Sequence, residues 1–262
     1  MSILFGVLVG FALGLTGGGG SLLAVPLLVY GLQIAPREAF GVSLAAVGAT
    51  ALIGVIPRLK AGQVEIGIGL IFAVAGMIAA PAGTWFARLI PETALLASFS
   101  ILMLFVAWQM WRKPLTTAQS DEITGEPTCQ RTADSKLTLT SRCAMLLILL
   151  GLLTGFLAGM FGVGAGFVIV PALVLFSRMP IHRAVATSLF IIVMVSVSGV
   201  ASHFAAGHDI SLQLTGLFVL GGVIGLSLAG RVAKHLSGPM LQKVFAVGIT
   251  AVAMFVITKT LS

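Results

Sequence analysis

Charged residues are scarce in this sequence. Only 9% of the 262 residues are Asp, Glu, Lys or Arg, and 58% are hydrophobic. Soluble domains carry roughly 25% charged residues, and the mean hydropathy of this chain is +1.12. A soluble fold could not hide so much apolar surface. The scarcity of charge therefore predicts an all-α polytopic membrane protein.

The sequence also lacks the signatures of enzymes that work within a membrane. It contains no HExxH, no GxSxG, no paired acidic residues inside an apolar run and no coordinating cluster of Cys and His. Its two cysteines, Cys129 and Cys143, offer neither a CxxC spacing nor the pattern of a disulfide framework, so we expect both to be incidental. We accordingly expect no catalysis, no cofactor and no metal site.

Long apolar runs divide the chain. Six have the length of an ordinary membrane span, about 20 residues: 39–57, 66–87, 93–111, 184–202, 211–230 and 240–258. Two longer apolar regions, 1–33 and 144–177, are each interrupted by glycines, as TGGGGS at 16–21 and FGVGAG at 161–166. We expect the arms on either side of each interruption to be too short to cross the membrane comfortably. A polar stretch without apolar periodicity, 112–142, reads as a flexible linker. We therefore divide the chain into membrane repeats 1–111 and 143–262 around that linker.

The two halves match at a constant offset of 145 residues. Of the 17 residues in GFALGLTGGGGSLLAVP (10–26), seven are identical in GFLAGMFGVGAGFVIVP (155–171), including the final proline. The register continues without an insertion through Ser43/Ser188 and Gly54/Gly199 as far as Gly76/Gly221. Such sustained register indicates an internal duplication, which is common in transporters.

The distribution of Lys and Arg indicates how the interrupted regions cross the membrane. If each region crosses once, the 15 basic residues divide 8 to 7 between the two sides. If each region turns back at its glycines as a helical hairpin, they divide 12 to 3, and the poorer side holds only Arg37, Arg88 and Lys259. The positive-inside rule favours the second arrangement. It predicts ten helical segments in two inverted repeats, each a Gly-broken hairpin followed by three transmembrane helices.

Glycine suits the apex of such a hairpin because it reaches positive φ and allows close approach of a ligand or another backbone. The arms of the first hairpin, about 15 and 12 residues, reach roughly 22 and 18 Å, so its apex should lie inside the membrane. Helices that start at Ser21 and Gly166 would point their N-terminal N–H groups at a small anion. The alternative is that the glycines only allow tight helix packing, which we expect of Gly6, Gly10 and Gly14.

The repeated Gly-rich segment, the downstream proline and the pair PREAFGVSLAAV and IHRAVATSLFII resemble the TauE/SafE family of membrane transporters, the sulfite exporter group. The resemblance covers about residues 1–111 and 142–262. It implies a secondary transporter for sulfite, sulfoacetate or a related small organosulfonate. Because the same helix ends could select ions in an open pore, a passive anion channel remains the alternative.

Polar side chains next to the glycines complete the predicted site. Ser43 and Ser188 are equivalent in the two repeats; their hydroxyls would bind either the anion or a carbonyl one turn back. The expected substrate-binding residues are Thr16, Gly17, Gly18, Gly19, Gly20, Ser21, Ser43, Gly162, Gly164, Gly166, Thr187 and Ser188. Arg37, Arg58, His182 and His203 mark the helix ends as an anion-attracting vestibule or as interfacial side chains that reach water.

The expected surroundings follow from the same patterns. The partners are the lipid bilayer and a small anionic substrate, with a proton or sodium ion as the candidate coupling ion and no nucleic acid. The location is the cytoplasmic (inner) membrane, with both termini outside and the linker in the cytoplasm.

Overall fold

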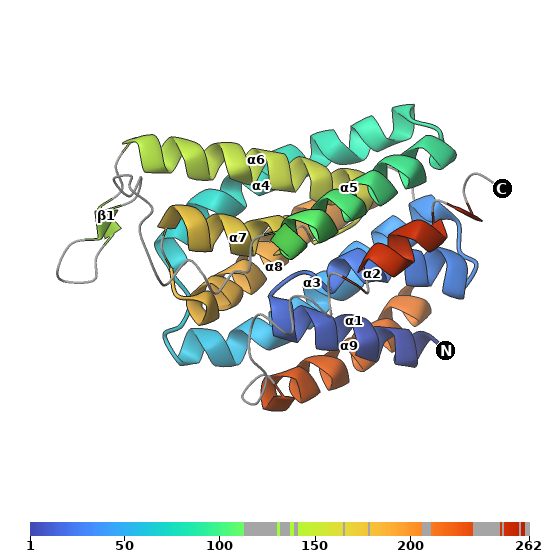
Figure 1. Ribbon diagram of the computed structural model, residues 1–262, viewed down its shortest axis with the longest axis horizontal. Coiled ribbons are helices and arrows are strands. Elements are labelled where there is room, and N and C mark those ends of the chain that lie inside the picture. Colours follow the sequence, from blue (N-terminus) through green and yellow to red (C-terminus); the bar gives the residue numbers. More distant parts are fainter. Residues whose placement is uncertain are drawn as a thin grey trace.

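The structure is a computed structural model that describes residues 1–112, 130–131, 137–138, 141–164, 166–177, 179–205, 211–232, 247, 249–256 and 258–259. Its fold is helical (Figure 1). The first half contains α1 (Ser2–Thr16), α2 (Ser21–Pro26), the π-helix η1 (Leu27–Gly31), α3 (Pro36–Lys60), α4 (Ile66–Leu89) and α5 (Glu92–Arg112). The second half contains α6 (Ser141–Phe161), α7 (Gly166–Ser177), α8 (Ile181–Ala205) and α9 (Leu212–Val232), and residues 249–256 are also helical.

Five of these helices are long and apolar enough to cross a membrane: α3, α4, α8, α9 and residues 143–161 of α6. The expected spans at 39–57, 66–87, 93–111 and 184–202 fall within α3, α4, α5 and α8, and the span at 211–230 coincides with α9 except for its first residue. Part of the span expected at 240–258 lies outside the described residues. We expected arms too short to cross at both interruptions, which is wrong for α6, whose 21 residues reach about 31 Å.

The linker contains a short pair of strands where the sequence predicted no regular structure. β1 (Gln130–Arg131) pairs antiparallel with β2 (Leu137–Thr138). Cys143, at the start of α6, is fully buried and disulfide-bonded. The expectation that both cysteines are incidental is therefore wrong for Cys143.

Two seams of small residues hold the outer helices together. α1 lies along α9 at one edge of the molecule, and α6 lies along α4 at the opposite edge (Figure 1). A Cβ at Gly10 would overlap the backbone of Gly222, and a Cβ at Gly155 would overlap the backbone of Gly76. Glycine permits this approach of the two backbones, which is how helices pack where lipid removes the hydrophobic driving force. The expected packing role of Gly6, Gly10 and Gly14 is confirmed, because all three face α9.

Each of these seams joins one sequence half to the other. α1, in the first half, packs against α9, in the second half, and α6, in the second half, packs against α4, in the first half. α1 and α6 are equivalent in the 145-residue register, and so are α4 and α9. In both seams residue numbers rise together, from Gly6 beside Gly221 to Gly14 beside Ala229, so the paired helices run parallel. The two halves therefore interlock.

Between the seams, α3 and α8 cross each other antiparallel. Gly199 lies against Leu44, Gly48 against Ser196, and Gly54 is within 3.5 Å of Leu189, measured from an ideal Cβ. The residue numbers of α3 rise as those of α8 fall. α3 and α8 are equivalent in the 145-residue register, so two equivalent helices meet in opposite directions at the centre of the fold.

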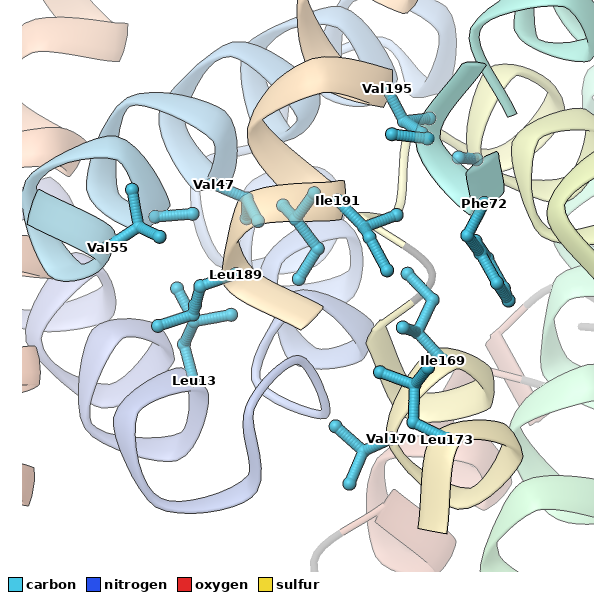
Figure 2. Close-up of a cluster of buried hydrophobic side chains, with 14 of the residues drawn as sticks. Leu13, Val47, Val55, Phe72, Ile169, Val170, Leu173, Leu189, Ile191 and Val195 are labelled. Atoms are coloured by element: carbon cyan, nitrogen blue, oxygen red, sulfur yellow. The ribbon is translucent and has the colours of Figure 1, made fainter. Parts of the chain in front are cut away.

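One apolar core surrounds this crossing and draws on both halves of the chain. Figure 2 shows Leu13 of α1, Val47 of α3 and Phe72 of α4 in the same cluster as side chains of α7 and α8, among them Ile169 and Leu189. α7 packs against α8 and thereby brings the glycine interruption before it to the centre of the molecule.

Candidate functional site

Helical structure is interrupted at the two predicted places. We call residues 17–20, between α1 and α2, break 1, and residues 162–165, between α6 and α7, break 2; residue 165 is not described. Gly17 has φ of 72° and Gly162 has φ of 63°. A left-handed glycine directly after a helix is a common helix terminator, because a Cβ would crowd the following carbonyl oxygen. The same device ends α1 and α6 at equivalent positions.

The chain reverses direction at break 1. Gly31, at the end of η1, lies against the ring of Phe5 near the start of α1, with 2.5 Å between an ideal Cβ and Cε2. Closer to the turn, Gly20 packs against the backbone of Val9 and Leu13. Gly20 therefore lies between the two arms rather than at the surface that break 1 presents to the rest of the molecule.

The two breaks touch each other. A Cβ at Gly18 would overlap the Cα of Gly166, and a Cβ at Gly166 would overlap the Cα of Gly18. Each break also rests on a long helix of the other half: a Cβ at Gly17 would lie 2.9 Å from Cγ2 of Val185 in α8, and a Cβ at Gly162 would overlap the backbone of Phe40 in α3. Phe40 and Val185 are themselves 145 residues apart.

Hydroxyl groups bind the backbone of break 1. Thr16 Oγ1 accepts the Gly19 N–H at 2.9 Å and donates to the Ala12 carbonyl at 2.7 Å. Ser21 Oγ donates to the Gly18 carbonyl at 2.6 Å. Ser188 Oγ, from the other half of the chain, donates to the Gly17 carbonyl at 2.6 Å, with the Val185 carbonyl at 2.8 Å.

The first N–H groups of α2 are also bonded within break 1. The N–H groups of Ser21, Leu22 and Leu23 donate to the carbonyl oxygens of residues 18, 19 and 20 at 3.3, 3.0 and 3.1 Å. Tight i→i−3 bonds of this kind satisfy donors that a helix start otherwise leaves free. The N–H groups that the sequence led us to aim at an anion are therefore engaged in this conformation.

Break 2 has a different chemistry. The residues that correspond to Thr16 and Ser21 are Phe161 and Gly166, which carry no hydroxyl. Ser43, which corresponds to Ser188, is fully buried, and its Oγ has no hydrogen-bond partner. Among the described residues, no side chain bonds to the backbone of residues 162–164. Gly164 rests on Val47 Cγ1 at 3.0 Å and Ile192 Cγ2 at 3.1 Å from an ideal Cβ.

Thr187 lies apart from the two breaks, although Ser188 follows it directly. Its hydroxyl oxygen accepts the N–H of Glu65 at 3.0 Å, in the loop between α3 and α4, and lies 3.8 Å from the sulfur of Met179. Glu65 also forms an ion pair of 2.9 Å with Arg183, near the start of α8. Thr187 thus joins α8 to that loop.

The four vestibule residues lie at the ends of α3 and α8. Because these helices are antiparallel, Arg37 and His203 belong to one end of the crossing and Arg58 and His182 to the other. Arg37 Nε is 3.6 Å from a Glu92 carboxylate oxygen, and Arg58 Nη1 donates to the Gly54 carbonyl at 3.3 Å. His182 is exposed, whereas His203 is only 4% exposed and does not face open solvent.

Two features escaped the sequence analysis. Ser196 is buried against Gly48, and its Oγ has no hydrogen-bond partner. Its equivalent in the first half is Ala51, so Ser196 is not among the polar residues that repeat between the halves. The helix after break 1 changes to a π-helix beyond Pro26, whereas the equivalent Pro171 lies inside α7.

No group of His, Cys, Asp and Glu in the described part of the chain could hold a metal ion.

The comparisons with known proteins agree on one family. Residues 2–256 match the family model described as Sulfite exporter TauE/SafE. A probable membrane transporter protein of Xylella fastidiosa is 35% identical over 261 residues, which cover 97% of this chain and 93% of the relative. The probable membrane transporter protein YunE of Bacillus subtilis is 28% identical over 92% of this chain and 89% of its own length.

A more distant relative is a probable membrane transporter protein of Methanocaldococcus jannaschii, 30% identical over 78% of this chain and 73% of that protein. No solved structure matches this chain. The family match extends across both halves and both breaks, and the apolar helices agree with a multi-pass membrane protein. The chain belongs to the TauE/SafE sulfite exporter family of membrane transporters.

Proposed function

We propose that this protein is a secondary transporter that carries a small sulfur-containing anion, such as sulfite, sulfoacetate or a related organosulfonate, across the cytoplasmic membrane. The sulfur chemistry comes from the family description. The observation that carries the location of the site is the contact between break 1 and break 2 at Gly18 and Gly166. The fully buried hydroxyl of Ser43, which has no partner, belongs to α3, the helix that break 2 contacts. Discontinuous helices that meet between repeats are a usual place for a transported substrate.

The two repeats in this proposal are inverted relative to each other. The antiparallel crossing of α3 and α8 supports this topology, because a single crossing at each break would make these equivalent helices parallel. α1 begins at the end of the molecule marked N, whereas α6 begins at the opposite end, beside β1, and this too supports inversion (Figure 1). Inverted repeats allow one site to face the two sides of the membrane in turn.

The proposed orientation has both termini outside and the linker in the cytoplasm. The 12 to 3 division of Lys and Arg supports it. The disulfide at Cys143, where the linker meets α6, argues against a cytoplasmic linker, because disulfides are rare in the cytosol. Labelling of the linker, described in the Discussion, distinguishes the two.

Binding at the breaks would not require a buried ion pair. The backbone dipoles of the helix starts and a hydroxyl donor can stabilise an anion. A site of this kind selects by size and by the geometry of the acceptor oxygens. Because no full ion pair must be broken, the anion can also leave readily. In the present conformation the glycine backbones of the two breaks are in contact, so we propose that they separate when the anion enters.

Reconstitution of the purified protein in liposomes tests the proposal. Radiolabelled sulfite or sulfoacetate should enter with saturable kinetics, and unlabelled anion inside the liposomes should accelerate entry of the label by counterflow. Counterflow requires a carrier whose site alternates between the two sides. Unitary currents in a planar bilayer, without counterflow, would instead establish the passive anion channel.

A further inference from the structure

Two equivalent serines are in opposite states in this structure. Ser188 Oγ donates to the carbonyl of Gly17 in break 1. The matching bond in the other half would join Ser43 Oγ to the carbonyl of Gly162, yet Ser43 Oγ has no partner although the residue is fully buried. A buried hydroxyl without a partner loses its bonds to water and gains nothing in exchange. Such a group in a native fold requires an explanation.

The position of Ser43 on α3 directs it toward break 2. Phe40 lies one turn before Ser43 and contacts Gly162, and Val47 lies one turn after it and contacts Gly164. Residues three and four apart share one face of a helix, so Ser43 lies on the face of α3 that break 2 covers. Glycines 162 and 164 place no side chain over that face. A small movement of break 2 would open space beside the hydroxyl.

Break 1 offers no comparable hydroxyl donor. The hydroxyls of Thr16, Ser21 and Ser188 are bonded to its backbone, and the N–H groups of residues 19 and 21–23 are bonded to Thr16 Oγ1 and to the carbonyls of residues 18–20. An anion at break 1 would have to break several of these bonds. At Ser43 an anion would supply an acceptor to a hydroxyl that has none.

We infer that Ser43 is the specificity-determining hydroxyl donor of the anion site, on the side of break 2, and that break 1 with Ser188 is the scaffold against which break 2 closes. The inference rests on the proposed function and assigns unequal roles to two halves that arose from one sequence. The anion provides an oxygen acceptor to Ser43 Oγ and lies near the start of α7, a helix of 12 residues whose N-terminal end favours negative charge.

Three single variants of the full-length protein test the inference: Ser43→Ala, its repeat equivalent Ser188→Ala and the control Ser196→Ala. Ser196→Ala also removes a buried hydroxyl without a partner, but this one faces Gly48 in the seam between α3 and α8. For each purified protein, equilibrium binding of radiolabelled sulfite and of sulfoacetate gives a dissociation constant, and thermal unfolding gives the melting temperature.

For Ser43→Ala we expect a dissociation constant higher by about tenfold or more, the usual effect of one hydrogen bond to a charged group, and a melting temperature that is not lowered. Ser188→Ala should melt at a lower temperature, because it loses its bond to break 1, and should bind the anion with nearly unchanged affinity. Ser196→Ala should leave the affinity unchanged.

Other outcomes overturn the inference. Wild-type affinity in Ser43→Ala would do so, as would a lower melting temperature, which would show that this hydroxyl has a partner within the protein. Loss of binding in Ser188→Ala with normal binding in Ser43→Ala would move the site to break 1 and leave the proposed function intact. If the wild-type protein binds neither sulfite nor sulfoacetate, the proposed function itself fails.

Discussion

Glycine at position 162 meets two requirements at break 2, a positive φ and close approach to the backbone of Phe40. Alanine substitutions can measure the free energy that each requirement represents. The residue has φ of 63°, and a Cβ there would overlap the Cα and carbonyl oxygen of Phe40. Gly62, in the loop between α3 and α4, has nearly the same backbone conformation, with φ of 65°, but nothing lies within 4 Å of its ideal Cβ position. Gly62→Ala therefore reports the backbone strain alone, and Gly162→Ala reports the strain together with the steric overlap.

The expected free energies follow from these contacts. A Cβ in the left-handed conformation costs about 1–2 kcal/mol, and the reduced entropy of the unfolded chain returns about 0.4–1 kcal/mol. Gly62→Ala should therefore lower the free energy of unfolding by about 1 kcal/mol. The overlap at Gly162 adds about 1–3 kcal/mol, the typical cost of overpacking. Because the atoms in the way belong to the backbone of α3, no side-chain rotation can relieve it.

Unfolding of the purified protein by SDS in mixed detergent micelles measures both variants against the wild type. We expect Gly162→Ala to be less stable than Gly62→Ala by about 1–3 kcal/mol. Equal stability of the two variants would refute the reasoning, because it would mean that break 2 does not lie against Phe40.

Three further expectations concern transport and orientation. Gly19→Leu should abolish transport while the protein still inserts into the membrane, because a bulky side chain would strain the turn or fill the space that we propose for the anion; retained transport would count against the proposed site. Removal of Arg37 or Arg58 should change the uptake rate and its salt dependence more than the affinity, because charges at the mouths steer ligands, and a pure affinity effect would place these residues in the site. Single cysteines in the linker, 112–142, should react only with reagents that reach the cytoplasm, and reaction from outside would reverse the orientation.

Part of this architecture follows from the sequence by simple physics. Long apolar runs must satisfy their backbone hydrogen bonds internally, which is why the expected spans coincide with helices such as α3 and α8. The glycines that follow α1 and α6 predicted breaks, and Gly17 and Gly162 have the positive φ values that justify glycine there. The distribution of Lys and Arg indicates on which side each loop lies, but it does not give the length of a helix. It therefore could not show that α6 is long enough to cross the membrane before the break at Gly162.

The hydrogen-bond partner of each polar side chain in the site could not be predicted from the sequence. Ser43 and Ser188 occupy equivalent positions, and only the packed structure shows that one hydroxyl has a partner and the other has none. Whether a hydroxyl bonds to a neighbouring carbonyl is decided by distances of a few tenths of an ångström, which depend on how the two breaks meet. Thr187 is a similar case, because the loop that its hydroxyl binds is 122 residues away along the chain.

Equilibrium binding to the purified wild-type protein tests the central claim most directly, with sulfite, sulfate, thiosulfate and small sulfonates compared under one condition. We predict saturable binding of at least one of these anions, with clear discrimination among them by size and oxygen geometry. Gly164→Leu should lose that binding, because its side chain would project from break 2 toward Val47, on the face of α3 that carries Ser43. Absence of saturable binding by every one of these anions, or equal binding in the wild type and Gly164→Leu, would contradict an anion site at the glycine breaks.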